Sequence, residues 1–590
     1  MENVDFGFTP SPYQQQIFDF IRHGTGNAVI RAYAGSGKTK TIVSAMKLVP
    51  KSNTCLFIAF NKSIVEELTG KLKGYNNCCV KTLHSLGFAM CKKNLEKEIE
   101  VDEYKYRGYI KNNICSISEM DCAMADRQDI DVYIDTVCEL VQFARYNLCQ
   151  TEREIGRIAE KYEIPIKYDE LAVTVKCLKW GKEHTDVLDY TDMVWLPYEL
   201  SMNPRGFQYD YIFADEVQDF SKAYVDLMLR CFKRGTRFTV VGDQSQCINQ
   251  FSGSSNDAFE YMCSYPNTKI FSLPISYRCD KSIIEMARQF VPDIQWRDDA
   301  GEGKFMNECF LAQVKSGDMI LARSKAPLAK VYTKLLKRKV KCYIKGHDLA
   351  DTFLELLNSI DAEALNRELF SDGVFTQLYD RMFTYRNQLM DTRNMDLADA
   401  SLSRGVLNMY DNINTLMTLS EGLNTKTELI EHIENIFVND GDGICLSTIH
   451  KAKGLEADNV YILCRSTMPP KRVERKWEIE QEQNLIYVAY TRAKHTLGFI
   501  SENECPPAGI LEDDDDIINA FRFYENKVCS ILRKEPKSDK PSVDLAEFRL
   551  RTATDIPDPH ENDNMVVISG NTEDTPDTIG DLDDLLADLP

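Results

Sequence analysis

The chain has 590 residues, of which 43% are hydrophobic and 27% charged, a composition typical of a folded protein with more than one core. It contains no apolar run of the roughly 18 residues needed to cross a membrane, and Met1–Pro10 lacks the basic start and apolar centre of a secretion signal. Its 19 cysteines show no C-x-x-C spacing, which favours reduced thiols. We therefore expect no membrane association and no secretion, but a cytoplasmic, nucleoid or nuclear-type reducing compartment.

The net charge of −21 argues on its own against a nucleic-acid-binding protein. Much of this charge is local, because residues 552–590 contain eleven Asp and Glu and neither Lys nor Arg. The rest of the chain carries about −10, so net charge opposes nucleic-acid binding only weakly and the sequence motifs have to decide.

Short apolar segments alternate with helical stretches along the chain, a pattern typical of parallel α/β folding. Segments 92–195 and 346–439 interrupt this alternation and are expected to be mainly helical, and residues 552–590 are expected to be disordered. Because open α/β sheets bind ligands at the carboxyl ends of their strands, polar clusters that follow strands are candidate sites. In chain order, the expected strands are 28–31, 55–59, 211–214, 238–241, 320–322, 444–448 and 460–463.

The first expected strand runs into a turn of small residues with P-loop spacing. Backbone amides in such a turn close around phosphates at the start of a helix, where the helix dipole also favours anions. Lys38 is expected to reach the β- and γ-phosphates of ATP, and Thr39 to hold Mg²⁺. The alternative is a chance glycine-rich turn. The pattern predicts a nucleotide site formed by Ala34, Gly35, Ser36, Gly37, Lys38 and Thr39.

Two further strands end in polar clusters. After the strand 211–214, Asp215 is expected to hold Mg²⁺ through water and Glu216 to orient or deprotonate the attacking water. After the strand 238–241, Gln246 is expected to sense the γ-phosphate. Phe251 follows in the same loop and either stacks on a base, a contact of about 1–3 kcal/mol, or only packs the loop.

The motifs resemble those of superfamily 1A helicases, the group of UvrD, Rep and PcrA. The matching segments occur in the family's order and extend from Gln14 to Lys494. They are Ser11–Gln15, Ala34–Thr39, Phe57–Lys62, Thr82–Gly87, Asp215–Asp219, Gly242–Gln246, Leu273–Arg278, Ser447–Glu456 and Leu485–Lys494.

The resemblance implies further roles in nucleotide binding. Gln14 corresponds to the glutamine that reads adenine, and Tyr277 to the ring that stacks on it. Arg278 is expected to touch the γ-phosphate, Glu456 to hold the ribose, and Arg492 to act as the arginine finger. The implied cofactors are ATP and Mg²⁺.

The resemblance also implies contacts with nucleic acid. In the family, the segments that correspond to Phe57–Lys62 and Thr82–Gly87 contact the bound strand. The expected strand-contacting residues are Phe60, Asn61, His84, Phe251, Thr448 and His450.

The implied architecture consists of two RecA-like domains with parallel sheets, each carrying a mainly helical insertion. ATP is expected to bind between the two domains. The expected boundaries are 1–91 and 196–275 for domain 1A, 92–195 for insertion 1B, 276–345 and 440–503 for domain 2A, 346–439 for a short insertion 2B, 504–551 for a C-terminal extension and 552–590 for the acidic tail.

The implied function is that of a monomeric ATP-dependent DNA helicase, which moves 3′ to 5′ on single-stranded DNA and unwinds duplex DNA in replication, repair or recombination. Two other motors remain open: a translocase that removes proteins without much unwinding, which the short second insertion favours, and an RNA helicase. A nucleotide-dependent scaffold is a non-enzymatic alternative, against which the retained Lys38, Glu216, Gln246 and Arg492 argue.

The acidic tail contains one segment with helical periodicity. Apolar residues at 579, 582, 585, 586 and 589 fall on one helical face, with carboxylates on the other. Residues 570–590 are therefore a candidate docking segment for a replication or repair protein, and a solubilising charged end is the alternative.

Overall fold

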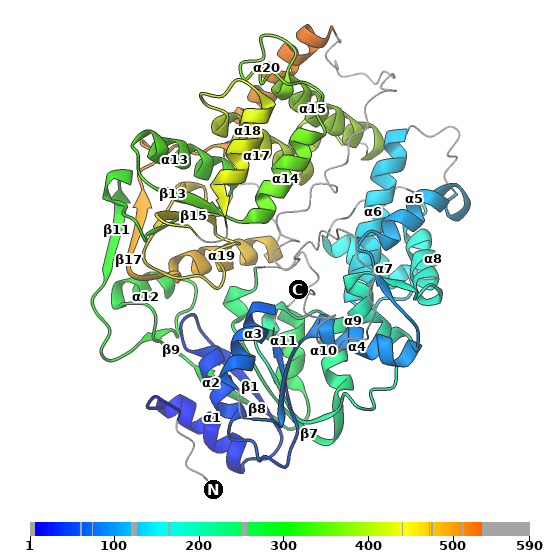
Figure 1. Ribbon diagram of the computed structural model, residues 1–590, viewed down its shortest axis with the longest axis vertical. Coiled ribbons are helices and arrows are strands. Elements are labelled where there is room, and N and C mark those ends of the chain that lie inside the picture. Colours follow the sequence, from blue (N-terminus) through cyan, green and yellow to red (C-terminus); the bar gives the residue numbers. More distant parts are fainter. Residues whose placement is uncertain are drawn as a thin grey trace, which may run out of the picture. The chain divides into compact units, whose positions relative to one another are not determined.

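The computed structural model describes residues 6–533, apart from 60–61, 73–74, 120–126, 163, 165, 167, 249–255, 394, 439–440, 471–472, 474–475 and 510–511. The described chain divides into two units between Tyr277 and Arg278, each containing a parallel sheet (Figure 1). The predicted α/β class with two parallel sheets is confirmed. The tail expected to be disordered lies outside the described residues. Within the described part, a helix with the length and hydropathy of a membrane span does not occur.

The first unit is built on a six-stranded sheet with the order β3-β2-β6-β7-β1-β8, in which every neighbouring pair is parallel. Strands β6, β7 and β1 are adjacent, so their carboxyl ends lie side by side. The strands are β1 (Asn27–Ala32), β2 (Cys55–Ala59), β3 (Cys78–Thr82), β6 (Tyr209–Ala214), β7 (Phe232–Gly242) and β8 (Thr268–Leu273), and β9 (Ile275–Ser276) follows. The helices are α1 (Pro12–His23), α2 (Lys38–Met46), α3 (Lys62–Lys71), α4 (Leu83–Leu95), α10 (Lys222–Arg230) and α11 (Asn256–Ser264).

Both faces of this sheet are buried, because alternate residues of each strand enter different cores. In β2, Phe57 packs with α1, α2 and α3, whereas Leu56 and Ile58 pack with α4, α10 and α11. In β1, Ile30 and Val29 divide in the same way. Burial on both faces explains why these strands are continuous apolar runs, the pattern from which they were predicted.

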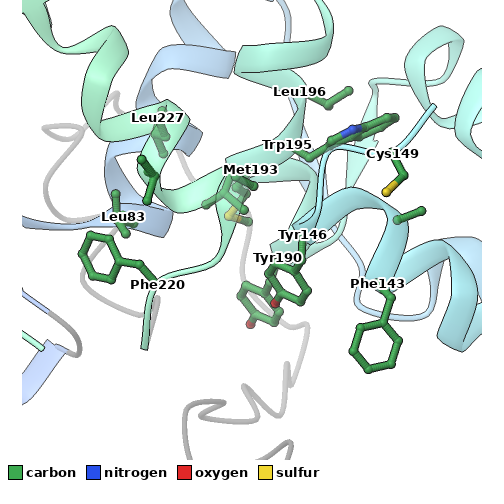
Figure 2. Packing of buried hydrophobic residues seen from close by; sticks show 14 of the residues in the cluster. Leu83, Phe143, Tyr146, Cys149, Tyr190, Met193, Trp195, Leu196, Phe220 and Leu227 are labelled. Atoms are coloured by element: carbon green, nitrogen blue, oxygen red, sulfur yellow. The ribbon is translucent and has the colours of Figure 1, made fainter. Parts of the chain in front are cut away.

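The helical insertion of the first unit shares one core with the sheet. It contains α5 (Lys105–Ile117), α6 (Arg127–Tyr146), α7 (Glu152–Tyr162), α8 (Glu170–Glu183) and α9 (Tyr190–Glu199), with a short parallel pair β4 (Glu100–Val101) and β5 (Val187–Leu188). Figure 2 shows Trp195 and Met193 of α9 between Leu83 and Leu227 on one side and Phe143 and Cys149 on the other. The expected boundaries 91/92 and 195/196 fall inside the helices α4 and α9.

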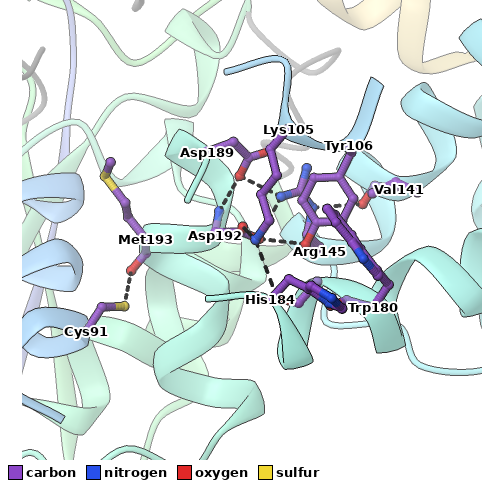
Figure 3. A network of polar contacts seen from close by, with 11 residues as sticks. Cys91, Lys105, Tyr106, Val141, Arg145, Trp180, His184, Asp189, Asp192 and Met193 are labelled. Carbon is purple, nitrogen blue, oxygen red and sulfur yellow. Dashed lines mark hydrogen bonds and ion pairs between the residues drawn. The ribbon is translucent and has the colours of Figure 1, made fainter. Parts of the chain in front are cut away.

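A buried group of charges joins three helices of this insertion (Figure 3). Asp192 of α9 accepts bonds from Lys105 of α5 at 2.5 Å and from Arg145 of α6 at 2.9 Å. Arg145 also pairs with Asp189, the N-cap of α9, at 2.6 Å. Two cations and two carboxylates thus pair with one another, and their mutual attraction offsets the desolvation of four buried charged groups. The group fixes α9 relative to α5 and α6.

The second unit is built on a seven-stranded sheet with the order β11-β17-β16-β12-β15-β13-β14, again entirely parallel. Its strands are β11 (Lys304–Cys309), β12 (Met319–Ala322), β13 (Cys342–Lys345), β14 (Phe437–Val438), β15 (Ile444–Thr448), β16 (Ala457–Ile462) and β17 (Ala493–Ile500), and β10 (Gln295–Trp296) precedes them. Its helices are α12 (Lys281–Ala287), α13 (Lys325–Lys337), α14 (His347–Asn358), α15 (Val374–Arg393), α16 (Leu397–Ser401), α17 (Arg404–Leu419), α18 (Lys426–Ile436), α19 (Lys476–Tyr490) and α20 (Asp514–Leu532).

The segment expected as the second insertion packs continuously with this sheet. Buried residues of α14, α15, α17 and α18 belong to the same core as β12 and α13. Asp411 of α17 supplies the N-terminal cap that α13 lacks from its own residues, accepting bonds from the backbone amides of Lys325 and Ala326 at 3.1 and 3.2 Å. The helices after β13 therefore belong to the same folded unit as the sheet.

Candidate functional site

The turn after β1 has the backbone conformation that the P-loop spacing predicts. Gly35 and Gly37 adopt φ values of 71° and 76°, a left-handed conformation that L side chains rarely adopt. Gly37 is the N-cap of α2. Because glycine has no side chain, it cannot accept hydrogen bonds from the first backbone amides of the helix. Ala34 and the Ser36 side chain are buried beside them, and the Ser36 hydroxyl has no protein partner. Such a turn at a helix N-terminus is suited to bind an anion.

Lys38 and Thr39, the first two residues of α2, meet the carboxylates that follow β6. The Thr39 hydroxyl donates to Asp215 Oδ2 at 2.6 Å. Lys38 Nζ lies 3.3 Å from Glu216 Oε1. Residues 176 positions apart are therefore brought together, because β1 and β6 end at the same edge of the sheet. The structure thus brings the predicted phosphate-binding and metal-binding residues of the first unit into contact.

The two carboxylates differ in their surroundings. Asp215 is 2% exposed, and its burial, reinforced by the charge of Glu216, raises its pKa to about 6. Glu216 retains partial exposure and has a left-handed backbone, with φ 54°. A non-glycine residue in this conformation is strained. The left-handed backbone points the Glu216 side chain in a different direction from that of an extended residue.

Gln218 connects the two polar clusters and was not predicted as a site residue. Its side-chain amide donates to Glu216 Oε2, and its carbonyl oxygen accepts the backbone amide of Asp243 at 3.0 Å. Gln246, the expected sensor, donates to Asp243 Oδ2 at 2.6 Å. A continuous chain of hydrogen bonds therefore runs from Glu216 to Gln246. The sequence signal for Gln218 is its place within the helicase-like segment Asp215–Asp219.

The first unit offers oxygen ligands suited to Mg²⁺. Thr39 and Asp215 provide a hydroxyl and a carboxylate at one point, and burial raises the pKa of both Asp215 and Asp243 to about 6. Lys38 is a single cation beside three carboxylates, so a divalent ion would offset the remaining negative charge. Among the described residues, no group of three or more His, Cys, Asp and Glu side chains has metal-binding geometry. The residues present fit Mg²⁺, which uses few protein ligands and otherwise takes phosphate and water oxygens.

The two residues expected at adenine both lie close to this turn. Gln14 is buried in α1; its carbonyl oxygen accepts the Ser11 amide at 2.9 Å and its NH₂ group donates to Thr41 of α2 at 2.8 Å. The backbone amide of Tyr277 donates to the Gly35 carbonyl at 2.8 Å, and the Tyr277 side chain is 43% exposed. The tyrosine thus presents an exposed ring next to the P-loop, whereas the Gln14 amide is held by protein groups at both ends.

In the second unit, Glu456 lies between two cations. Arg278 Nε donates to Glu456 Oε2 at 2.7 Å, and Lys494 Nζ lies 3.1 Å from Glu456 Oε1. Burial on its own would raise the pKa of Glu456, but the two cations outweigh burial and lower this pKa. Arg278 also donates to the Thr491 carbonyl at 3.1 Å. Arg278 and Glu456, which were predicted to bind the same nucleotide, are therefore direct partners, and Lys494 is an additional residue of this group.

Arg492 is 1% exposed and bonded to the backbone around it. Its Nε donates to the Val488 carbonyl at 3.0 Å and its Nη1 to the Leu455 carbonyl at 3.1 Å. It precedes β17 directly, as Glu456 precedes β16, and Ala457 donates its amide to the Arg492 carbonyl at 3.1 Å. The charged residues of the second unit thus lie at the amino ends of two strands, a place that the carboxyl-end rule did not predict.

The structure describes only some of the residues that are expected to contact a nucleic-acid strand. Phe60, Asn61 and Phe251 lie outside the described residues. His84 is half-buried between the rings of Tyr190 and Tyr224, and its Nε2 lies 3.4 Å from the Tyr224 hydroxyl. Burial lowers the pKa of His84 to about 4, so this imidazole is neutral at pH 7.

Thr448 is the last residue of β15, His450 lies two residues beyond it, and both are nearly buried, with exposures of 9% and 4%. The Thr448 carbonyl accepts the Ala452 amide at 3.0 Å, and the His450 carbonyl accepts the Lys453 amide at 3.1 Å. Both residues therefore help to form the tight turn after β15.

Two family comparisons match most of the described chain. Residues 13–264 match the UvrD/REP helicase N-terminal domain, and residues 374–504 match the UvrD-like helicase C-terminal domain. The matched ranges contain the P-loop, the carboxylates after β6, Glu456 and Arg492.

Curated relatives include an F-box DNA helicase protein 1 of Schizosaccharomyces pombe, 26% identical over 84% of this chain and 60% of the relative. An ATP-dependent DNA helicase Rep of Buchnera aphidicola is 22% identical over 55% of this chain and 51% of the relative. An ATP-dependent DNA helicase PcrA of Bacillus subtilis is 22% identical over 89% of both chains. The chain therefore spans between half and two thirds of the first two relatives and nearly all of the third.

Proposed function

We propose that this chain, which belongs to the UvrD/REP helicase family, hydrolyses ATP in order to move along single-stranded DNA and to unwind duplex DNA. One observation carries the ATPase part of the proposal. The P-loop residues Lys38 and Thr39 contact Glu216 and Asp215, so the groups needed to bind a nucleotide and to activate water already lie together. The names of the relatives support DNA as the substrate.

In the first unit, we assign Lys38 and the amides at the start of α2 to the ATP phosphates. Thr39 and Asp215 would hold Mg²⁺, which when bound neutralises phosphate charge. Glu216 orients the attacking water and accepts its proton, and Gln218 holds the Glu216 carboxylate in position. Gln246, at the other end of the same hydrogen-bond chain, senses the γ-phosphate.

In the second unit, we assign Arg278 and Arg492 to the neutralisation of charge that develops on the γ-phosphate. Glu456 binds the ribose hydroxyls. Because Arg278 is bonded to Glu456, it must exchange that carboxylate for phosphate during the cycle. Tyr277 stacks on adenine, and Gln14 reads the base edge.

Among the proposed strand contacts, we assign His84 to a base or sugar of the bound DNA. Its lowered pKa makes it a neutral imidazole, which suits contact with a base or sugar better than an ion pair with a phosphate. We retain Phe60, Asn61, Phe251, Thr448 and His450 as proposed strand contacts.

The first experiment measures ATP hydrolysis with and without single-stranded DNA, for the wild type and for Glu216→Gln. We expect stimulation by DNA in the wild type and a loss of about 10²- to 10⁴-fold in kcat in the variant. Glu260→Gln is a matched control, because Glu260 is an exposed carboxylate of the same unit, 3.5 Å from Arg31. Absence of hydrolysis in the wild type with DNA and Mg²⁺ would refute the motor and favour a nucleotide-dependent scaffold.

The proposal also covers the direction of movement along DNA and the extent of duplex unwinding. We propose 3′ to 5′ movement by a monomer, from the resemblance, and roles in replication, repair or recombination. Duplexes with either a 3′ or a 5′ single-stranded tail test the direction, and only the 3′-tailed substrate should be unwound. Displacement of streptavidin from biotinylated DNA without duplex unwinding would instead identify the protein-removing translocase. Stronger stimulation by RNA than by DNA would identify an RNA helicase.

We further propose that residues 570–590 dock on a replication or repair protein, and that the protein works in a cytoplasmic, nucleoid or nuclear-type compartment. The apolar positions at 579, 582, 585, 586 and 589 support a helix that forms on its partner. Deletion of 570–590 should abolish co-purification with single-strand-binding and repair proteins while leaving DNA-stimulated ATPase activity intact. Unchanged co-purification would identify the tail as a solubilising end.

A further inference from the structure

Two cysteines face each other at the edge of the first sheet. Strands β2 and β3 pair in parallel, and their register places Cys55 directly opposite Cys78. Neighbouring strands lie about 4.8 Å apart, and disulfides accept Cα separations of about 4.4–6.8 Å. Both side chains lie on the sheet face that packs against α1, α2 and α3. The backbone thus holds the two thiols at a spacing that a disulfide can bridge.

The two thiols have different surroundings. Cys55 is fully buried, whereas Cys78 is partly exposed. Interaction with the Cys78 thiol, together with burial, raises the pKa of Cys55, and interaction with the Cys55 thiol lowers the pKa of Cys78. Cys78 is therefore the thiol that is both accessible to a small oxidant and more readily ionised, and Cys55 is the thiol that keeps its proton.

We propose that Cys55 and Cys78 are a redox-active pair that hydrogen peroxide converts reversibly into an intramolecular disulfide. The Cys78 thiolate attacks one peroxide oxygen, the O–O bond breaks, and the products are the Cys78 sulfenic acid and hydroxide, which becomes water on protonation. The Cys55 sulfur then attacks the Cys78 sulfur; the S–S bond forms, the S–O bond breaks, and the departing hydroxide takes the Cys55 proton as water. A dithiol reductant returns both cysteines to thiols.

The disulfide would add a covalent bond at an edge strand of the sheet. Strand β3 lies at the sheet edge and pairs with β2 alone. The bond would close the loop between residues 55 and 78, which contains α3, and would reduce the conformational freedom of the unfolded chain. We therefore expect the oxidised protein to melt several degrees higher than the reduced protein.

The test maps the oxidised bond in the full-length protein. After mild peroxide treatment and alkylation of the remaining thiols, trypsin should give one linked species composed of Ser52–Lys62 and Gly74–Lys81, lighter than the two free peptides by two hydrogen atoms. Dithiothreitol should release the two peptides. Because Cys79 lies in the same peptide as Cys78, the linked species should persist in Cys79→Ser and disappear in Cys78→Ser.

The reactivity of the thiols towards peroxide gives a second measure, first in the wild type and then in one variant. Cys115 in α5 is exposed and serves as an internal reference within the same digest. Cys78 should react with limiting peroxide several-fold faster than Cys115. In Cys55→Ala, which lacks the second thiol, Cys78 should accumulate a sulfenic acid that dimedone captures. The proposal is overturned if peroxide leaves the two peptides unlinked, if the bond joins Cys78 to Cys79, or if Cys78 reacts no faster than Cys115.

Discussion

The two units assemble their charged groups at opposite ends of their strands. In the first unit, Asp215 and Asp243 follow the carboxyl ends of β6 and β7, as the general rule for parallel sheets predicts. In the second unit, Glu456 and Arg492 precede the amino ends of β16 and β17. The carboxyl-end rule therefore locates a site in one sheet and misses the charged group in the other.

The two groups also have opposite charge. The first gathers three carboxylates around Lys38, and the second gathers Arg278 and Lys494 around Glu456. An excess of buried carboxylate favours a cation and a polarised water, whereas an excess of cations favours phosphate. Under the proposed function, the first unit would supply the metal and water chemistry and the second unit the neutralisation of phosphate charge.

Replacement of Arg492 should have the largest effect. Arg492→Ala removes a buried positive charge that is assigned to the γ-phosphate, and we expect kcat for DNA-stimulated ATP hydrolysis to fall about 10³-fold. Steady-state kinetics at saturating ATP measure it. Arg465→Ala is a matched control, because Arg465 also bonds within this unit, to the Tyr490 hydroxyl at 2.7 Å. An equal loss in both variants would show that Arg492 acts only through packing.

Replacement of Gln218 tests whether the hydrogen-bond chain positions the catalytic carboxylate. Gln218→Ala frees the Glu216 side chain, so kcat should fall about 10- to 100-fold, while the KM for ATP stays nearly unchanged. Gln244→Ala is the control, since Gln244 lies in the neighbouring loop and bonds to the exposed Glu260 at 2.9 Å. A rise in KM without a change in kcat would contradict the positioning role.

Replacement of Lys494 should have a smaller effect, on binding alone. Lys494→Met removes one of the two cations that hold Glu456, and we expect the KM for ATP to rise about three- to tenfold with little change in kcat. Lys281→Met is the control, because it removes an ion pair of the same unit, with Glu302 at 2.5 Å. If the two variants have the same KM, Lys494 is not part of the nucleotide site.

The smallest expected effect is a pH-dependent change in stability. Because the folded pKa of Asp215 is raised from 3.8 to about 6, the folded protein binds more protons than the unfolded chain between these values, and this group makes the protein less stable as the pH rises through that window. Asp215→Asn should therefore increase the free energy of unfolding of the metal-free protein at pH 8 by about 1–2 kcal/mol.

Urea unfolding with a chelator at pH 8 and pH 5 measures this difference, which should shrink at pH 5 because the wild-type carboxyl is then largely protonated. Asp186→Asn, at an exposed carboxylate of the same unit, should show no such gain. A loss of stability in Asp215→Asn at pH 8 would contradict the charge argument.

The sequence determined the fold class and predicted which polar residues follow the strands of the first unit. All seven predicted strands exist; β2 and β15 have the predicted limits, β7 begins six residues earlier than predicted, and the others differ by one to three residues at an end. Strands of a parallel sheet buried on both faces are continuous apolar runs, which a single sequence reveals. Six strands of the two sheets were not predicted: β3, β8, β11, β13, β14 and β17. Of these, β3 (Cys78–Thr82) and β17 (Ala493–Ile500) include polar residues, and their assignment depends on pairing with distant strands.

The tertiary structure decided which side chains meet. Phosphate-binding and carboxylate residues could be predicted because each follows its own strand, but the contact of Thr39 with Asp215 depends on the order of strands in the sheet. The role of Gln218 as a bridge, the partnership of Lys494 with Glu456 and the pairing of Cys55 with Cys78 have no local signal. Local sequence patterns predict the strand or turn to which a residue belongs. These contacts arise instead from packing between segments far apart in the chain.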